Sequence, residues 1–215
     1  NTLTYEGGIG ADTLKVTGAI NSSTIYGDNA VSLVDGNDSI SIGGSASGSY
    51  IYANSGDDSV HIVGNVTAST VYLNTGNDSL SIDAGLIASS VYGGSGNDSF
   101  YIVNGASTAA LIDGGVGNDF LSLGALSGTS SLLGGAGEDL LTVAGAATQW
   151  LVDAGVDADT IYITNAAERT TVLGGSGADS INIGVVSKGL VQAGTENDTI
   201  LVTGTGVTSA SLKSG

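Results

Sequence analysis

An aspartate recurs along this chain at a spacing of about twenty residues. Each copy closes a glycine-rich hexapeptide and is followed by a short stretch in which apolar and polar residues alternate. The successive spacings are 26, 20, 20, 20, 21, 20, 20, 20 and 19 residues. A period of this length is typical of a solenoid, in which each repeat forms one coil and buries its apolar face against its neighbours. The aspartates are Asp12, Asp38, Asp58, Asp78, Asp98, Asp119, Asp139, Asp159, Asp179 and Asp198.

Three apolar columns accompany the aspartates. The second and fourth residues after each aspartate are apolar and the residue between them is mostly polar, which predicts a strand with one buried face. A third apolar column precedes each turn and predicts a second strand in every coil. In chain order the columns are Leu14, Ile40, Val60, Leu80, Phe100, Leu121, Leu141, Ile161, Ile181 and Ile200; Val16, Ile42, Ile62, Ile82, Ile102, Leu123, Val143, Ile163, Ile183 and Val202; and Tyr5, Ile25, Ile51, Val71, Val91, Ile112, Leu132, Val152, Val172 and Val191.

The predicted fold class is all-β: a parallel β-solenoid of about ten coils of about 20 residues, with two strands and two turns in each coil. The coils would stack at about 4.8 Å into two parallel sheets. Only one turn edge carries the glycine–aspartate hexapeptide, while the other edge is small and irregular, as in residues 64–67 and 145–148. We therefore expect the functional site on the first edge. The six surplus residues of the first spacing fall in residues 27–32 and predict a local bulge.

Composition narrows the class of protein further. The 215 residues include 36 glycines and no proline, yet 41% are hydrophobic, which excludes a disordered glycine-rich linker. The net charge of −17 disfavours nucleic acid and anionic membranes as partners and attracts cations. No apolar run is long enough to span a bilayer, and without cysteine there is no disulfide framework.

We expect residues 1–215 to form a single repeat domain. The sequence opens within one repeat and closes within another, without the atypical capping repeats that end a soluble solenoid. This pattern indicates a fragment of a longer array, or a unit whose copies stack end to end or side by side.

The aspartate column predicts a metal. Stacked coils bring like charges about 5 Å apart, which costs roughly 3 kcal/mol for each neighbouring pair at an effective dielectric constant near 20. The four basic residues, Lys15, Arg169, Lys188 and Lys213, are too few to neutralise the column. Carboxylates together with backbone carbonyls that glycine conformations turn to one side suit Ca²⁺. Ten stacked turns leave nine gaps between neighbouring turns. One Ca²⁺ ion in each gap would bring a charge of +18 against the chain's net charge of −17.

Five of the turns match a known motif. Residues 7–14, 93–100, 114–121, 134–141 and 174–181 resemble the calcium-binding nonapeptide GGxGxDxUx of RTX (hemolysin-type) proteins. The resemblance implies a calcium-loaded β-roll that is extracellular or on a bacterial cell surface, exported by type I secretion. This chain departs from the family because only one edge carries the motif, so we expect a single file of Ca²⁺ ions. The predicted ligands are the ten aspartates with the backbone carbonyls of Gly8, Gly10, Gly94, Gly96, Gly115, Gly117, Gly135, Gly137, Gly175 and Gly177.

Some turns depart from the motif, and other residues have alternative interpretations. Asp157 and Glu196 replace the later glycine, which puts their sites in doubt unless the extra carboxylate joins the coordination. The aspartates can also be read as turn residues that bond their own backbone.

The preceding asparagines, such as Asn77 and Asn97, predict an amide ladder. The column Tyr26, Tyr52, Tyr72 and Tyr92 predicts a stacked aromatic ladder, with a platform for surface polysaccharide as the alternative.

Three classes of function fit these features to different degrees. The first is a calcium-binding structural segment of a secreted surface protein, such as a surface layer, a sheath or a large adhesin. A calcium-dependent ice-binding or adhesion module is the alternative, because Asn74–Asp78 approaches the GTGND turn of such modules. A polysaccharide lyase or epimerase is disfavoured, because His61 and Arg169 lie more than five coils apart and catalysis needs a base beside a charge stabiliser. We therefore predict that the chain is not an enzyme.

Overall fold

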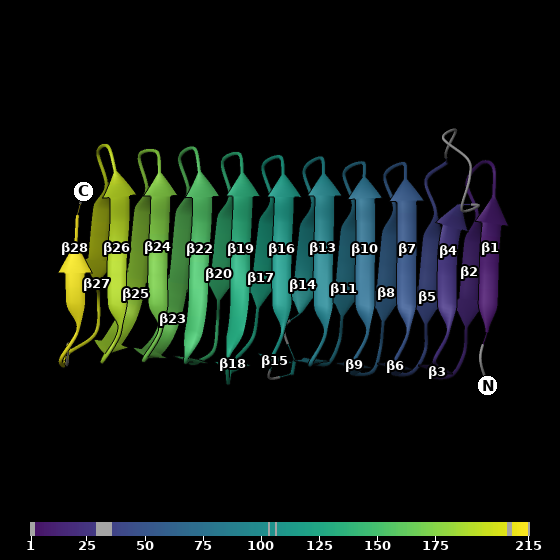
Figure 1. Cartoon of the computed structure of the whole chain (residues 1–215), viewed down its shortest axis with the longest axis horizontal. Coiled ribbons are helices and arrows are strands. Elements are labelled where there is room, and N and C mark those ends of the chain that lie inside the picture. Colours follow the sequence, from purple (N-terminus) through teal and green to yellow (C-terminus); the bar gives the residue numbers. More distant parts are fainter. Residues whose placement is uncertain (1–2, 29–35, 103, 106, 206–207, 215) are drawn as a thin grey trace.

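The chain forms a parallel β-solenoid whose coils are stacked along one axis (Figure 1). The computed structural model describes residues 3–28, 36–102, 104–105, 107–205 and 208–214, and all regular secondary structure in them is β-strand. Residues 29–35, which include most of the predicted bulge, lie outside the described residues. The described residues include no helix long and apolar enough to cross a membrane.

The first sheet contains the strand that precedes each turn with the aspartate motif. Neighbouring strands are parallel and in register, so that Val71 lies between Ile51 and Val91. Its eleven described strands are β1 (Thr4–Gly8), β4 (Thr24–Asp28), β7 (Tyr50–Ser55), β10 (Thr70–Thr75), β13 (Ser90–Ser95), β16 (Leu111–Val116), β19 (Ser130–Ala136), β22 (Trp150–Val156), β24 (Thr171–Ser176), β26 (Leu190–Thr195) and β28 (Ser211–Lys213).

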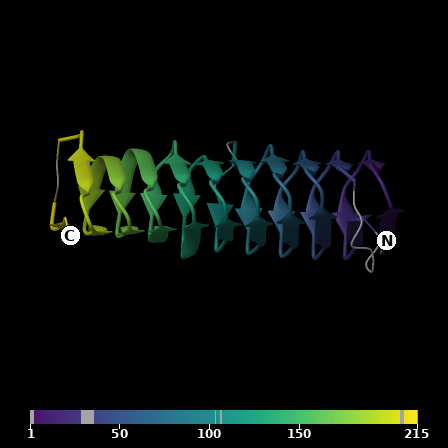
Figure 2. The same ribbon diagram turned by 90° about the horizontal axis from the view of Figure 1, so that it is seen from above.

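The second sheet begins directly after each aspartate. Its strands are also parallel and in register, with Leu80 between Val60 and Phe100. These strands are β2 (Thr13–Val16), β5 (Ser39–Ile42), β8 (Ser59–Ile62), β11 (Ser79–Ile82), β14 (Ser99–Ile102), β17 (Phe120–Leu123), β20 (Leu140–Val143), β23 (Thr160–Glu168), β25 (Ser180–Ser187) and β27 (Thr199–Val202). Figure 2 shows the two sheets as two layers joined at every coil.

Most coils contain a third strand, so the prediction of two strands in each coil was wrong. After a short bend, two residues add a further parallel ladder to the second sheet, and in β23 and β25 one longer strand covers both segments. Val66 and Ala147, which the sequence assigned to an irregular turn, are fully buried in this ladder. A two-residue strand is too short to show alternation, so the pattern hid it. The strands are β3 (Ile20–Asn21), β6 (Ala46–Ser47), β9 (Val66–Thr67), β12 (Leu86–Ile87), β15 (Ser107–Thr108), β18 (Leu126–Ser127) and β21 (Ala147–Thr148).

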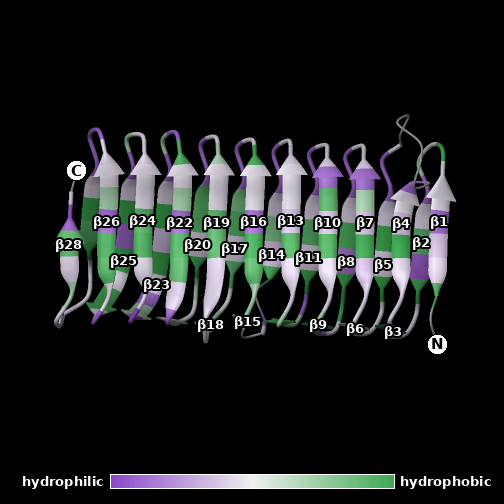
Figure 3. Ribbon diagram, in the orientation of Figure 1, coloured by the Kyte–Doolittle hydropathy of each residue, from purple (hydrophilic) through white to green (hydrophobic). Residues whose placement is uncertain are grey.

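The three predicted apolar columns form the core between the two sheets. Their members are at most 2% exposed in the inner coils, while the first and last coils, as at Leu14 and Ile200, are half-buried. Each buried Val, Leu, Ile or Phe side chain contributes about 1.5–3 kcal/mol to folding. Figure 3 shows the resulting hydrophobic bands running across neighbouring strands of the first sheet. This regular core aligns the glycine–aspartate turns, which lie at the arrowhead ends of the first sheet (Figure 1).

Candidate functional site

The candidate site is the column of glycine–aspartate turns, which we call the motif edge. We number the six turn positions so that Gly93 is the first and Asp98 the sixth. The second and fourth positions have a left-handed backbone, with φ of 110° at Gly94 and 120° at Gly96. Glycine adopts this conformation without steric cost, whereas a residue with a Cβ adopts it only under constraint. The turn therefore favours glycine at these two positions, although Asn54 and Asn74 take the second position and Asp157 and Glu196 the fourth, with φ from 78° to 89°.

The ten predicted aspartates lie in one file along the motif edge. From Asp12 to Asp179, the backbone N–H of each aspartate donates a hydrogen bond to Oδ1 of the aspartate in the next coil, at distances from 2.7 to 3.0 Å. From Asp38 to Asp179 the residues are only 1–3% exposed, while Asp12 and Asp198 are half-buried. A carboxylate that accepts a backbone N–H makes a strong, charge-assisted hydrogen bond. The aspartate ladder thus joins each coil to the next.

The second carboxylate oxygen has no such partner. Oδ2 is buried and accepts no hydrogen bond at nine of these aspartates, namely Asp12, Asp58, Asp78, Asp98, Asp119, Asp139, Asp159, Asp179 and Asp198. Leaving a buried acceptor unsatisfied costs about 1–3 kcal/mol, and more when the group is charged. A cation or a proton beside such a row of oxygens would offset this cost.

Burial raises the pKa of the seven carboxyl groups from Asp58 to Asp179 above the ordinary aspartate value of 3.8. Loss of hydration is the largest cause, the N–H bond to Oδ1 opposes it, and neighbouring carboxylates add to it. For Asp179 the pKa is raised for the same reasons. The pKa reaches about 8 at Asp58, about 7 at Asp98, Asp139 and Asp159, and about 6 at Asp78 and Asp119.

Oδ2 of the aspartate lies close to the first turn position. A Cβ built on Gly93 would collide with Oδ2 of Asp98 and with the carbonyl oxygen of Gly114 in the next coil. Gly114 is placed in the same way against Asp119 and Gly134. Oδ2 of one coil and a carbonyl oxygen of the next therefore both approach the Cα of a first-position glycine, where no side chain would fit. Hard oxygen ligands of this kind fit Ca²⁺.

The predicted carbonyl oxygens of Gly94 and Gly96 point along the stack, against the Cα atoms of Gly115 and Gly117 in the next coil. A first-position carbonyl, which the sequence analysis did not select, also lies near Oδ2, as at Gly114 and Asp98. The full set of calcium ligands stays a prediction. Among the described residues, no three His, Cys, Asp or Glu side chains gather around one metal site. Backbone carbonyls must therefore supply much of any coordination shell.

The opposite edge carries a second ladder that the sequence analysis missed. The backbone N–H of Ser49 donates to Oγ of Ser69, 2.9 Å away, and the Ser69 N–H donates to Oγ of Ser89. The Ser69 hydroxyl then donates to the carbonyl of Thr67. The recurrence of Ser23, Ser49, Ser69 and Ser89 in register was the sequence signal for this ladder. The hydroxyls of Ser49, Ser69 and Ser89 thus each accept one hydrogen bond and donate another.

The outer side of the motif edge carries the predicted amide ladder. Oδ1 of Asn77 accepts the backbone N–H of Asn97 at 2.8 Å, and Oδ1 of Asn97 accepts that of Asn118 at 2.7 Å. Asp57 joins the same ladder by accepting the N–H of Asn77. These bonds run from a side chain to the following coil, opposite in direction to the aspartate ladder. The asparagine prediction is confirmed.

The predicted tyrosine ladder is also present. Tyr26, Tyr52, Tyr72 and Tyr92 stack with ring centroids 5.0–5.1 Å apart and ring planes within 11° of parallel. The faces of the inner rings are covered by neighbouring rings, so they cannot also stack on a sugar. Their geometry supports a stabilising contact between coils.

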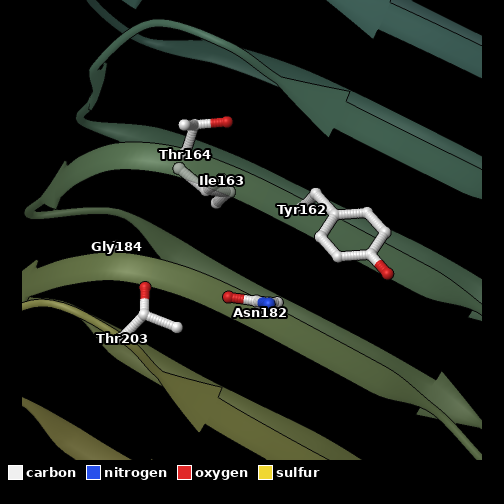
Figure 4. Close-up of a pocket in the computed structure, with 6 residues that line it drawn as sticks. All are labelled: Tyr162, Ile163, Thr164, Asn182, Gly184 and Thr203. Atoms are coloured by element: carbon white, nitrogen blue, oxygen red, sulfur yellow. The ribbon is translucent and has the colours of Figure 1, made fainter.

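His61 and Arg169, the candidate base and charge stabiliser, do not converge. His61 pairs with Asp83 at 3.1 Å, and both side chains are well exposed. Arg169 lies five coils further along and pairs with Glu168. A shallow hollow on the outer face of the second sheet is lined by Tyr162, Ile163, Thr164, Asn182, Gly184 and Thr203 (Figure 4). This lining contains no carboxylate, imidazole or amine that would serve as a general base.

One solved structure resembles this fold over almost the whole chain. It is the crystal structure of a hyperactive, Ca²⁺-dependent, β-helical antifreeze protein from an Antarctic bacterium. The TM-score is 0.50, the sequence identity is 20%, and the alignment covers 98% of this chain and 80% of that chain. No family model and no curated protein matches the sequence. The likeness supports the β-solenoid fold.

The raised pKa values predict an unusual pH dependence for the metal-free chain. Between the unfolded aspartate pKa near 4 and the folded values of about 6 to 8, the folded state holds more protons than the unfolded state. The free energy of unfolding should therefore fall as the pH rises through this window. Urea unfolding in metal-depleted buffer at about pH 5 and about pH 8 measures this. Equal stability at both values, or greater stability at the higher pH, would contradict the electrostatic account.

Proposed function

We propose that this chain is a calcium-binding structural segment of a secreted cell-surface protein, such as a surface layer, a sheath or a large adhesin. In this proposal Ca²⁺ ions between successive turns allow the solenoid to fold and make it stiff. The role is structural and not enzymatic. Export to a calcium-rich exterior by type I secretion belongs to the proposal and follows from the resemblance to RTX proteins.

The observation that carries the proposal is the difference between the two edges. Both edges use a side-chain oxygen of one coil to accept a backbone N–H of the coil before. At the opposite edge a neutral serine does this and keeps no unsatisfied atom, as at Ser69. At the motif edge an aspartate does the same but buries a second, unpartnered oxygen. A hydrogen-bond ladder of this kind does not require a charged side chain, because serine forms one at the opposite edge. We therefore propose that the second oxygen of each aspartate binds calcium.

The chemistry of the motif edge favours calcium over other metals. The available ligands are carboxylate and carbonyl oxygens, without a thiolate or imidazole in the column. Such ligands in an irregular arrangement suit Ca²⁺, whereas Mg²⁺ requires near-octahedral geometry and transition metals prefer nitrogen or sulfur. The solved protein of similar fold is Ca²⁺-dependent. A bound Ca²⁺ ion would compensate carboxylate charge from the two coils that it touches.

Stiffness follows from repetition of the same contacts. Each gap between inner coils contains the aspartate hydrogen bond, and several gaps add an amide, hydroxyl or tyrosine contact. Because binding of a ligand to the folded state alone stabilises that state, every ion adds to the same stack. We propose that residues 1–215 act as one repeat domain within a longer array. Stacked copies of this unit and surface polysaccharide are the partners that we propose besides calcium.

An ice-binding or adhesion module is a second candidate. It is favoured by the likeness in fold to an antifreeze protein and by Thr75 and Asn77, which occupy the third and fifth positions of one turn. The rest of this surface is less regular than an ordered ice lattice requires. The third turn position varies between apolar and polar residues, and the fifth position includes the carboxylates of Asp57 and Glu138. The third-position residues in described turns are Ile9, Ser55, Thr75, Ser95, Val116, Ala136, Val156, Ser176 and Thr195.

The main experiment compares the metal-free and calcium-loaded chain by circular dichroism at about pH 8. We expect little β-structure after removal of metal with EGTA, and recovery of the β-spectrum when Ca²⁺ is added. Mg²⁺ at the same concentration should not replace it. A chain that folds equally well in both conditions would remove calcium from the account.

A pair of variants serves as the control. Asp98→Asn keeps the oxygen that accepts the N–H of Asp78 but removes the buried charge. It should reduce the stabilisation by calcium by about 2.7 kcal/mol if one site is lost at a calcium concentration one hundred times its Kd. Ser69→Ala removes a ladder acceptor at the opposite edge and should cost about 1 kcal/mol with or without calcium. An unchanged calcium response in Asp98→Asn would show that the aspartates act only as ladder residues.

Thermal hysteresis separates the two candidates. The calcium-loaded chain should leave the freezing point and the shape of ice crystals unchanged, because its outer columns are irregular. Thermal hysteresis that disappears in Thr75→Ala, with the circular dichroism spectrum unaltered, would favour the ice-binding candidate instead.

A further inference from the structure

The first turn position differs from coil to coil, although it faces the interior everywhere. In most coils it is glycine, but in others a side chain fills the same place and is fully buried. None of the first-position glycines has a left-handed φ. Backbone conformation therefore does not explain why glycine is used there. The residues in chain order are Gly7, Gly27, Ala53, Leu73, Gly93, Gly114, Gly134, Ala154, Gly174 and Ala193.

Space explains the glycine better than conformation does. At Gly93, Gly114, Gly134 and Gly174 an added Cβ would collide both with Oδ2 of the aspartate in the same coil and with a carbonyl oxygen of the next coil. Those aspartates are 1–3% exposed, and their Oδ2 atoms have no hydrogen-bond partner. At each of these positions the two oxygens therefore approach the glycine Cα more closely than a side chain would allow.

The gaps after Ala53 and Leu73 are built differently. A methyl group or a whole isobutyl group lies at the first position there, with no exposed surface. The Oδ2 atoms of Asp58 and Asp78 are still buried and unpartnered. The tyrosine ladder spans these same two gaps, through the contacts of Tyr52 with Tyr72 and of Tyr72 with Tyr92. The ladder also spans the gap after Gly27, through Tyr26 and Tyr52, so aromatic contacts join the coils in all three of these gaps.

We propose that the residue at the first position sets the calcium affinity of the gap that follows it. Gaps after glycine bind Ca²⁺ tightly, while the gaps after Ala53, Leu73 and Ala154 bind it weakly, because a side chain at the first position pushes Oδ2 and the carbonyl oxygen of the next coil apart. The inference rests on the proposed calcium function. The gap after Gly27 is left unassigned, because its turn includes residues outside the described ranges.

The consequence is that the solenoid loads in two steps. Crowding an ion site with a methyl group is an overpacking effect, and effects of this kind correspond to an affinity change of about tenfold or more. As calcium rises, the glycine gaps fill first, in the first coil and in the later coils. Coils 3 to 5, which are defined by Asp58, Asp78 and Asp98, are joined by tyrosine stacking until their own weaker sites fill.

Calcium titration of designed variants tests this proposal. Isothermal titration calorimetry gives the size of the tight and weak classes, and native mass spectrometry counts the bound ions. Ala53→Gly should move one ion from the weak to the tight class, and Leu73→Gly should do the same. Gly114→Ala should move one ion in the opposite direction, with about a tenfold loss of affinity at that site.

Matched controls use the same substitutions away from the motif edge. Ala147→Gly removes a methyl group that is equally buried at the opposite edge. Gly18→Ala adds one where nothing lies within 4 Å. Neither should change the two classes, and circular dichroism in saturating calcium confirms that every variant is folded.

The possible results are distinct. Calcium binding with a single class of equal sites, or with class sizes that Ala53→Gly and Gly114→Ala leave unchanged, would overturn the two-class proposal and leave the calcium function standing. No calcium binding by the unmodified chain would overturn the proposed function and this inference together.

Discussion

The stability of this structure is limited by the repulsion between like charges, which are stacked and buried in one file along the motif edge. In a parallel solenoid each residue lies directly beside its equivalent in the next coil, so any interaction made once is made in nearly every gap. Repeated apolar side chains form a continuous core, whereas repeated buried carboxylates repel one another in every gap. The hydrogen bond from Asp78 to Asp98 recovers part of that penalty through Oδ1, but Oδ2 remains without a partner. The fold therefore keeps an electrostatic cost that another component must offset.

The two edges show two solutions to one backbone problem. At each corner of the coil a backbone N–H needs an acceptor that the sheet does not provide, and a side chain of the following coil supplies it. Serine solves the problem at Ser49, Ser69 and Ser89 without any remaining charge. Aspartate solves it at the motif edge and leaves an oxygen that faces a carbonyl of the next coil. The serine hydrogen bonds thus stabilise the fold without metal. In our proposal, the aspartate edge stabilises it only when calcium is bound.

The sequence predicted most of the fold because the period was long, regular and marked by unusual residues. Alternation around Leu80 and Ile82 identified the buried strand, and the aspartate spacing identified the stack. The two-residue strands such as Val66–Thr67 were missed because two residues cannot display a period of two. The hydroxyl ladder was missed because serine is common in ordinary turns, although its register with the aspartates was visible. The carbonyl that faces Oδ2 could not be predicted, because its direction depends on how one coil sits above the next.

A crystal structure of this chain grown in calcium, with anomalous scattering data, tests the central claim most directly. The account predicts anomalous difference density in the gaps of the motif edge, beside Oδ2 of the buried aspartates and between successive coils. Ions at the usual Ca²⁺–oxygen distance of about 2.3–2.6 Å from those atoms would establish it. A motif edge without such density, in a fully folded solenoid at saturating calcium, would contradict it.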